Sequence, residues 1–311
     1  MRIFLTGATG YVGGAVLDAL LRAGHEVTTL VRDNGKAAHV AARGAQPVIA
    51  NLAAPESFRA AAEAQDGYVH AALDTASGRG PSIEKIALET IIAAAKRPRT
   101  SRPESSPKRF IIFTSGVWVL GSAPEPVAED APTNPVAMAA HRPDHERLVL
   151  EAAGGPLRTV VVRPGVVYGG GNGMVGDIFK AATNGLVRVV GDGTNHWPLV
   201  YDRDLADLYA RVVANNDASG IYHANDEGDE RVNDLVAAIS PYLPVRPDVR
   251  HVPIEEARAK MGPYADALSL DQIVRSPRAR ALGWAPTLHS VAGNAARLLE
   301  EWRAAHHSAT R

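Results

Sequence analysis

A glycine-rich turn near the start of this 311-residue chain constrains its fold more than any other feature. The preceding residues 2–5 have the apolar character of a buried strand, and residues 13–23 have the apolar spacing of a helix. In a strand–turn–helix of this kind, one glycine permits the tight turn, a second lets a pyrophosphate approach the backbone, and a third lets the helix pack closely. The sequence therefore predicts a dinucleotide-binding turn with contacts from Thr6, Gly7, Thr9, Gly10, Tyr11, Val12 and Gly13.

Short apolar runs alternate with alanine-rich helical segments through the first half of the chain. The predicted strands are 2–5, 25–31, 46–50, 67–71, 109–114 and 158–162, with a helix at 81–95 among the intervening segments. Such alternation favours a parallel sheet with right-handed crossovers. We therefore predict an α/β fold with a Rossmann doubly wound parallel sheet.

The second half is less regular. It predicts strands at 198–201 and 220–224, and helices at 205–212, 233–239, 254–261 and 288–305. The basic stretch 97–107 contains proline and serine, which favour a solvated loop over a binding patch.

The end of the second predicted strand bears on the choice of cofactor. A carboxylate there would bind the ribose 2′-hydroxyl of NAD, whereas an arginine favours the 2′-phosphate of NADP. The sequence places Val31 at the acidic position and Arg32 after it. We therefore predict NADP(H) in preference to NAD(H). The carboxylate of Asp33 has two alternative roles, because it could contact the ribose or cap the next turn.

Composition excludes several classes of function. The chain has no cysteine, so disulfides, thiolate catalysis and cysteine-bound zinc are excluded. The formal net charge of −1 does not favour a nucleic-acid partner, so none is predicted. The sequence has no apolar stretch of about 18 residues, so no membrane span is predicted. The histidines lack ligand spacing with carboxylates, so no metal is predicted. No signal peptide is evident, and we expect a cytoplasmic protein.

Further short motifs follow the glycine turn along the chain. They are Asn51-Leu52, His70-Ala71-Ala72, Thr114-Ser115-Gly116, the stretch 163–169, Asp202 with 204–206, and 278–286. Together they resemble the extended branch of the short-chain dehydrogenase/reductase superfamily, which includes sugar-nucleotide epimerases and dehydratases. The resemblance implies further cofactor contacts at Asn51, Leu52, Ala71, Ala72, Thr114, Arg142 and Pro164.

The same resemblance implies the domain organisation. It implies an NAD(P)-binding Rossmann domain over 1–168, to which later segments at about 198–224 return. A smaller α+β substrate-binding domain would occupy 169–311. It also implies a small-molecule substrate and makes a homodimer plausible.

The catalytic residues of that superfamily are missing here. Its members use a Tyr-x-x-x-Lys pair, whose four-residue spacing places both side chains on one helix face. The corresponding positions hold Met138 and Arg142, and Gly116 stands at the usual hydroxyl position. The pattern resembles the atypical members, some of which are reductases that use other groups and some of which only bind the dinucleotide.

Other side chains are candidates for the missing roles. Ser115, His141 and Tyr168 are the candidate catalytic residues, His141 because it would share a helix face with Met138 and titrate near neutral pH. His145, one turn further, is a weaker candidate on the same grounds. The candidate substrate contacts are His196, Trp197 and Tyr201.

These observations favour one function and leave two alternatives. The preferred function is an atypical NADP-dependent oxidoreductase acting on a small carbonyl, enone or imine compound. The alternatives are a non-catalytic NADP(H)-binding redox sensor and a nucleotide-sugar epimerase or dehydratase.

Overall fold

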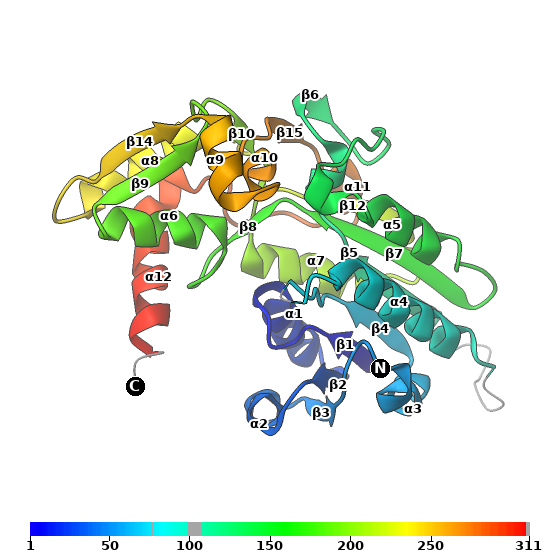
Figure 1. The fold of residues 1–311 in the computed structure, drawn as a ribbon. Coiled ribbons are helices and arrows are strands. Elements are labelled where there is room, and N and C mark those ends of the chain that lie inside the picture. Colours follow the sequence, from blue (N-terminus) through cyan, green and yellow to red (C-terminus); the bar gives the residue numbers. More distant parts are fainter. Residues whose placement is uncertain (76, 99–106, 309–311) are drawn as a thin grey trace. The chain divides into compact units, whose positions relative to one another are not determined.

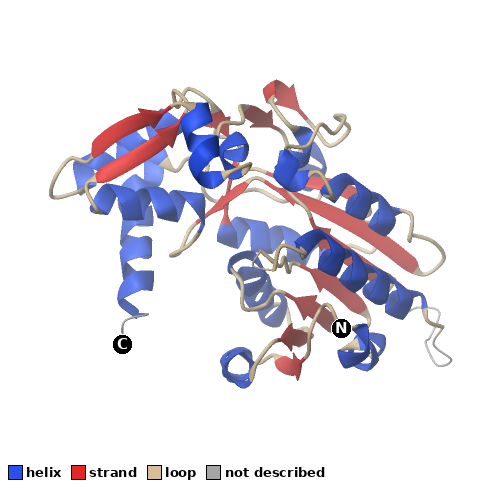
Figure 2. Ribbon diagram, viewed as in Figure 1, coloured by secondary structure: helices blue, strands red, loops and turns tan. Residues whose placement is uncertain are grey.

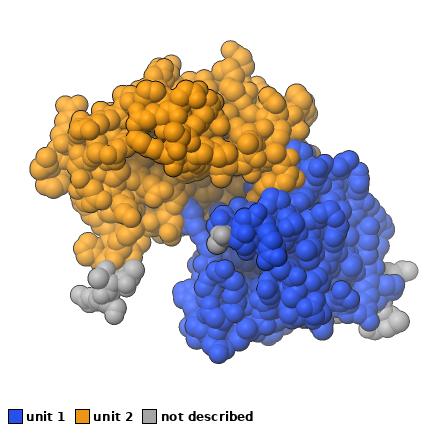
Figure 3. All heavy atoms as spheres, in the orientation of Figure 1, with its two compact units in different colours: residues 1–115, 143–162, 206–222 blue, residues 116–142, 163–205, 223–311 orange. Residues whose placement is uncertain are grey.

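The computed structural model describes residues 1–75, 77–98 and 107–308. Its contacts divide the chain into two compact units (Figure 3), each made of three separate stretches. Unit 1 comprises 1–115, 143–162 and 206–222, and unit 2 comprises 116–142, 163–205 and 223–311. The predicted domain boundary near residue 168 stays a prediction, and the segment 116–142 is grouped with unit 2.

A seven-stranded sheet forms the centre of unit 1 (Figure 1). Its order is β12-β7-β5-β4-β1-β2-β3, and every pairing from β7 to β3 is parallel. This is the doubly wound sheet that the alternating sequence predicts. The strands are β1 Arg2–Thr6, β2 Glu26–Val31, β3 Gln46–Ile49, β4 Gly67–His70, β5 Arg109–Thr114, β7 Leu157–Pro164 and β12 Gly220–Ala224.

Helices cover both faces of this sheet, with α4 and α5 on one side and α1 and α7 on the other (Figures 1 and 2). On the α4 side, Phe4, Tyr68 and Phe113 of three strands form an apolar core with Leu88 and Ile91 of α4. The helices are α1 Tyr11–Arg22, α2 Asn34–Ala42, α3 Arg59–Glu63, α4 Gly80–Lys96, α5 Arg142–Leu150 and α7 Asp202–Ala214, with a 3-10 turn η1 at Pro55–Ser57.

A buried arginine joins the last segment of unit 1 to the rest of its sheet. The guanidinium of Arg158 in β7 donates to the carbonyl oxygens of Val212 (2.9 Å), Val213 (3.1 Å) and Ala218 (3.2 Å). It also lies 4.9 Å from the ring centroid of Phe110. Burial lowers the pKa of Arg158 to about 10, so the side chain is still charged at neutral pH.

Unit 2 contains four two-stranded pairs, β8–β11, β9–β14, β10–β13 and β6–β15. The strands are β6 Ala123–Val127, β8 Val166–Tyr168, β9 Leu186–Val190, β10 His196–Trp197, β11 Leu199–Tyr201, β13 Glu230–Arg231, β14 Asp248–Val252 and β15 Gln272–Val274. Its helices are α6 Gly173–Thr183, α8 Val232–Ile239, α9 Ile254–Met261, α10 Tyr264–Leu268, α11 Pro277–Ala281 and α12 Ala295–Ser308. Its 3-10 turns are η2 Val117–Leu120, η3 Ala137–Ala139, η4 Ser240–Tyr242 and η5 Ala292–Asn294.

The prediction of one helix over 288–305 is wrong at its start, because α12 begins only at Ala295. The Glu230 carboxylate explains the difference, since it accepts hydrogen bonds from the amides of Val291 (2.6 Å) and Ala292 (2.8 Å) and from the Ser290 hydroxyl (2.7 Å). Amides held by a side chain in this way open a helix rather than lie inside one.

Two further sequence predictions concern a membrane span and the basic stretch 97–107. Among the helices of the described residues, none has both the length and the apolar character needed to cross a membrane. Most of the basic stretch 97–107 lies outside the described residues.

Candidate functional site

The candidate cofactor site lies at the carboxyl edge of the sheet in unit 1. Strands β1, β4 and β5 are parallel neighbours, with Thr6 opposite His70 and His70 opposite Phe113. Their carboxyl ends therefore meet at one edge, which is where open α/β sheets bind ligands. The residues that follow these strands are Gly7, Ala71 and Ser115.

The backbone of the glycine turn packs so closely that no side chain fits at two of its glycines. Gly7 has a φ of +84°, and a Cβ there would lie 2.4 Å from the carbonyl oxygen of Ala71. A Cβ at Gly13 would lie 2.2 Å from the carbonyl oxygen of Gly7. The Gly10 amide closes the turn by donating to the same oxygen at 2.8 Å. Glycine is therefore required at positions 7 and 13.

The start of α1 fits the pyrophosphate of a dinucleotide. Gly10 occupies the N-cap in an extended conformation, no side chain caps the helix, and its first turn holds no acidic residue. The positive end of the helix dipole therefore faces outward without a competing anion. Thr9, Tyr11 and Val12 lie in or beside this turn, and their contacts with the cofactor stay predictions. A nicotinamide cofactor held here supplies a hydride donor or acceptor.

Thr6, also a predicted cofactor contact, is fully buried. Its hydroxyl lies 2.7 Å from Nδ1 of His70, so it joins the ends of β1 and β4 beneath the turn. The structure therefore indicates that the Thr6 side chain supports the turn rather than touching the cofactor. His70 was noted only as part of a motif, and nothing near it in the sequence signals this pairing.

At the end of β2, Asp33 forms the helix cap that was one of its two predicted roles. Its carboxylate accepts the amide hydrogen of Lys36 at 2.8 Å and so caps α2. Arg32 beside it is exposed. Asn51, just beyond the neighbouring strand β3, stabilises its own turn by accepting the Ala53 amide at 2.9 Å. The end of β2 therefore presents the Arg32 cation, and the Asp33 carboxylate beside it caps α2.

Ser115 stands directly after β5 with its hydroxyl available. Its amide donates to the carbonyl oxygen of Val162 at 2.8 Å, which fixes the backbone. Its Oγ is buried and, among the described residues, has no hydrogen-bond partner. The hydroxyl of Thr114, by contrast, lies 2.6 Å from that of Tyr209. A buried hydroxyl without a partner is costly unless a ligand supplies one, so Ser115 remains the best-placed candidate.

The structure contradicts the reasoning that selected His141. Met138 lies in the 3-10 turn η3 with 44% of its surface exposed, and α5 begins only at Arg142. The two residues therefore do not share the face of one α-helix. Proline at position 143 explains the late start, since it is tolerated in the first turn of a helix but not in its interior.

His145 is not exposed on the helix surface. It is buried in unit 1, and its Nδ1 lies 2.7 Å from Oε2 of Glu84 in α4. This contact links α5 to α4. That no metal is bound stays a prediction.

Two tyrosines with predicted site roles are buried in unit 2. The Tyr168 phenol donates to Oδ2 of Asp226 at 3.1 Å, and burial next to that carboxylate raises the pKa of Tyr168. The Tyr201 phenol donates to Glu301 at 3.0 Å, and burial raises the pKa of Tyr201 to about 12. Because neither ring is solvent-accessible, the structure argues against Tyr168 as a proton donor and Tyr201 as a substrate contact.

The carboxyls of unit 2 near these rings are themselves perturbed. Burial raises the pKa of Asp226 to about 7 and that of Asp202 to about 6. Burial and the nearby Arg163 lower the pKa of His223 to about 4. None of these groups was singled out as titratable in the sequence, because each shift depends on residues far along the chain.

Leu52 and Ala72 lie in unit 1, and four further predicted contacts lie in unit 2. Pro164 ends β7 and Arg142 begins α5. His196 is half-buried, with its Nδ1 2.8 Å from Oδ1 of Asp271. Trp197 lines a cavity of about 250 Å³, together with residues of α6 and β9 that the sequence reading did not identify. The valine-rich run of residues 186–190 is the signal that could have indicated β9.

Comparison with known proteins gives this geometry its context. The sequence model of the NAD dependent epimerase/dehydratase family matches residues 3–224. The chain belongs to this family. An uncharacterized protein of Schizosaccharomyces pombe, C2A9.02, is 31% identical over 92% of this chain and 95% of its own. Membership confirms the predicted superfamily and the NAD(P)-binding Rossmann fold.

One sequence relative and one structural neighbour carry informative names. A 4-hydroxy-2-methyl-3-oxo-4-farnesyl-3,4-dihydroquinoline-1-oxide ketoreductase of Stigmatella aurantiaca is 27% identical over 83% of this chain and 78% of its own. The solved structure of human epimerase family protein SDR39U1 with NADPH aligns with a TM-score of 0.76 at 20% identity, covering 96% of this chain and 99% of its own. Other similar structures were solved with NAD.

Proposed function

We propose that this protein is an NADP(H)-dependent oxidoreductase that transfers a hydride between the nicotinamide and a small carbonyl compound. The observation that carries the proposal is the edge of the sheet in unit 1. There the glycine turn of residues 7–13 and the Ser115 hydroxyl, to which the described residues offer no hydrogen-bond partner, follow parallel strands of one sheet. Ser115 would donate a hydrogen bond to the substrate oxygen and so stabilise the negative charge that hydride transfer places on it.

The absence of a tyrosine base favours a reductase over a redox-neutral epimerase. An epimerase must remove and return a proton at the same site, and Met138 at the tyrosine position cannot do so. A reductase needs only one proton, which water can supply once a hydroxyl has polarised the carbonyl. The ketoreductase name of one relative supports this reading.

A second candidate is a dinucleotide sensor that binds NADP(H) without turnover. The exposed Met138, in place of a catalytic tyrosine, favours it. A sensor and a reductase differ in one respect that can be measured, which is transfer of the cofactor's hydrogen to another molecule.

Deuterium transfer from 4-deuterated NADPH tests the proposal directly. The purified protein is incubated with each stereoisomer of the labelled cofactor and a panel of ketones, enones and imines, and the products are weighed by mass spectrometry. We expect label in a ketone-derived alcohol. Tight NADPH binding with no labelled product from any compound would favour the sensor instead.

Ser115→Ala tests the assigned role in the same assay. We expect kcat/KM to fall about 100-fold, within the range of losing one donor to a developing oxyanion, with the NADPH Kd unchanged. Ser122→Ala, at an exposed serine, is the matched control and should retain full activity. Equal activities of the two variants would remove Ser115 from the mechanism.

The NADP preference has its own test in Arg32→Ala. A charge-assisted hydrogen bond to the 2′-phosphate is worth about 1.5–3 kcal/mol, so we expect the NADPH Kd to rise about 10-fold or more. The NADH Kd should not change, because NADH lacks that phosphate. Arg22→Ala, at an exposed arginine at the end of α1, should alter neither. A parallel loss of NADPH and NADH affinity would contradict the assignment.

A further inference from the structure

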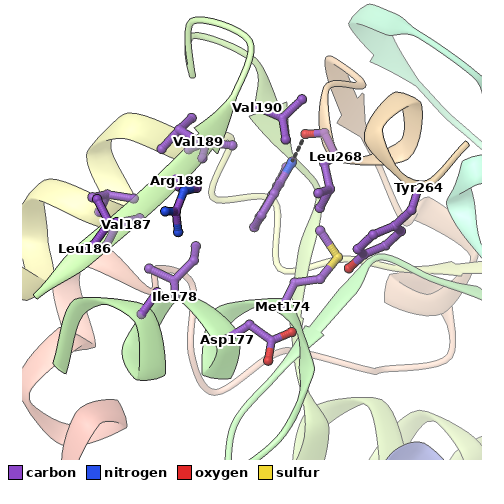
Figure 4. A pocket seen from close by; sticks show the side chains of 14 residues that line it. Met174, Asp177, Ile178, Leu186, Val187, Arg188, Val189, Val190, Tyr264 and Leu268 are labelled. Carbon is purple, nitrogen blue, oxygen red and sulfur yellow. Dashed lines mark hydrogen bonds between the residues drawn. The ribbon is translucent and has the colours of Figure 1, made fainter. Parts of the chain in front are cut away.

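Unit 2 contains a cavity of about 250 Å³ that lies between α6 and β9 (Figure 4). Met174 and Ile178 of α6 line one side of it, and Val187 and Val189 of β9 line the other. Trp197 and residues of α8 and α10 help to complete the lining. Every lining residue belongs to unit 2, so this unit alone forms the cavity.

Hydrogen bonds fix one wall of the cavity. The carbonyl oxygen of Leu268 accepts the indole N–H of Trp197 at 3.1 Å and the side-chain amide of Asn195 at 3.1 Å. The Asn195 amide also donates to the carbonyl oxygen of Leu270 at 2.9 Å. The Trp197 ring therefore has a fixed place in the wall. Binding to a wall that is already ordered costs less conformational entropy.

The lining separates into an apolar floor and a polar mouth. Val187, Val189 and Trp197 are all less than 9% exposed. The two charged lining residues, Asp177 and Arg188, are exposed. Binding sites for small molecules have this composition, with mostly apolar walls and a few polar groups that fix orientation.

Tyr264 brings a hydrogen-bond donor to the cavity. Its hydroxyl end points towards Met174 and Asp177 (Figure 4). Its ring packs edge-on against Trp118, with 6.3 Å between the ring centroids, which fixes its orientation. Burial and the nearby Asp177 raise the pKa of Tyr264, so the phenol keeps its hydrogen at neutral pH. An oxygen atom of a ligand can therefore accept a hydrogen bond from it.

We propose that this cavity binds a neutral compound with two fused aromatic rings and one oxygen atom that accepts a hydrogen bond from Tyr264. Aromatic rings pack favourably against the rings of Trp197 and Tyr264, and the Met174 thioether makes favourable contacts with ring edges. The inference goes beyond the proposed function, because the site lies wholly in unit 2 and binding there requires neither NADPH nor hydride transfer.

The volume sets the number of rings. An engineered apolar cavity of about 150 Å³ binds benzene, so 250 Å³ scales to about ten carbon atoms. Two fused aromatic rings contain this many carbon atoms, and 2-naphthol adds the single oxygen atom. This compound is therefore the matching probe for the cavity.

The lining does not suit a nucleotide. Of the described residues that line the cavity, Arg188 is the one cation and Asp177 is an anion, so the mouth offers no excess of positive charge to a phosphate. A nucleobase carries several hydrogen-bonding groups, and the apolar side chains of the floor would leave those groups without partners at a cost in free energy. A neutral ring system with a single polar atom avoids both costs.

Isothermal titration calorimetry of the full chain, without cofactor, tests the size and class of the ligand. We expect saturable binding of 2-naphthol with a Kd about 100-fold lower than that of phenol, because more ring carbons are buried. The larger 9-phenanthrol should gain no further affinity, because two rings already fill the cavity. Decahydro-2-naphthol has the same carbon skeleton without aromatic character and should bind about five-fold more weakly than 2-naphthol.

Three results of these titrations would overturn the proposal. The first is an absence of saturable 2-naphthol binding. The second is affinity that keeps rising with the third ring, which would indicate unspecific adsorption. The third is equal affinity for the aromatic and the saturated compound, which would remove the aromatic class.

Tyr264→Phe tests the hydrogen bond. The variant should bind 2-naphthol about five-fold more weakly than the wild type does, because a neutral hydrogen bond is lost. Naphthalene has no oxygen atom, so its Kd should be the same for both proteins. Equal changes for the two compounds, or no change for either, would overturn the assigned role of Tyr264.

A filling substitution locates the bound rings. Ala181 of α6 lines the cavity and is partly buried, so Ala181→Leu should weaken 2-naphthol binding at least about 10-fold and still leave space for phenol. An unchanged phenol Kd shows that the variant is folded. Ala259→Leu makes the same change at an exposed position of α9, outside the lining, and should bind both compounds like the wild type. Equal 2-naphthol affinities of the two variants would overturn the proposed location.

Uridine monophosphate tests the alternative ligand. We expect it not to displace 2-naphthol, whereas displacement at this site would show that a nucleotide binds there and would overturn the proposal. Deuterium transfer from labelled NADPH is measured separately and takes no part in these titrations. Failure of 2-naphthol to bind would therefore leave the proposed function standing, and an absence of deuterium transfer would leave the cavity assignment standing.

Discussion

Gly13→Ala is expected to weaken NADPH binding at least 100-fold. The added Cβ would lie 2.2 Å from the carbonyl oxygen of Gly7, a distance that real Cβ atoms do not reach. The clash is with backbone on both sides, so either the turn or the first turn of α1 must move. A displacement on the order of 1 Å takes the amides out of register with the phosphates and costs about 100-fold. Calorimetric titration with NADPH measures the loss.

The neighbouring glycine provides a matched control. A Cβ at Gly14 would lie 3.5 Å from the nearest atom, the Ala8 carbonyl oxygen, which is an ordinary contact. Gly14→Ala should therefore bind NADPH normally and gain about 0.5–1 kcal/mol of stability as a helix-interior replacement. Gly13→Ala should lose about 1–3 kcal/mol from overpacking and still fold. If a folded Gly13→Ala protein bound NADPH like Gly14→Ala, the glycine turn would not be the cofactor site.

Asp226→Asn is expected to change how stability depends on pH. Burial of the carboxyl raises the pKa of Asp226 to about 7 in the folded state, above its ordinary value of 3.8. Its favourable contribution is therefore complete below about pH 4 and is lost as the pH rises through 7. The difference is on the order of 4 kcal/mol. Asparagine cannot ionise and should abolish this loss.

Urea unfolding at pH 5 and pH 8 measures the effect. We expect Asp226→Asn to be about 1.5 kcal/mol more stable than wild type at pH 5 and about 4 kcal/mol more stable at pH 8. His223, with its lowered pKa, contributes the opposite slope, since its share is lost as the pH falls from 6.5 to about 4. The variant and the wild type both retain His223, so their difference isolates Asp226.

A carboxylate on the surface provides the comparison for that experiment. Asp248 is exposed and pairs with Arg250 at 2.7 Å. Exposed pairs contribute little, so Asp248→Asn should shift stability by less than about 1 kcal/mol at either pH. Parallel pH profiles for wild type and Asp226→Asn would show that Asp226 is ionised at little cost in the folded protein.

The parts of the fold that depend on local sequence could be predicted. Strands 109–114 and 220–224 and helix 254–261 have the observed bounds, because apolar periodicity sets them within a few residues. The glycine turn is equally local. Its geometry follows from glycine spacing next to a strand, and the structure explains why no side chain fits at positions 7 and 13.

The roles of single side chains depended on distant partners and could not be predicted. Tyr168 was a candidate catalytic residue, but Asp226, 58 residues later, accepts its hydroxyl hydrogen in the core. Tyr201 is bonded to Glu301, 100 residues away. The resemblance to the family indicated which residues could form the site. It did not indicate whether their side chains are buried, because tertiary packing decides burial.

The hydrogen bonds of Arg158 have a consequence for synthesis of the chain. Their three acceptors lie within residues 206–222, the last stretch of unit 1. A nascent chain that has reached Val162 therefore carries a buried cation with no acceptors and a sheet without its edge strand. The sheet of unit 1 cannot be completed until residue 222 has left the ribosome, by which point two of the three stretches of unit 2 have already emerged. The sequence of unit 1 is therefore complete while unit 2 still lacks residues 223–311, and neither unit can be obtained by cutting the chain once.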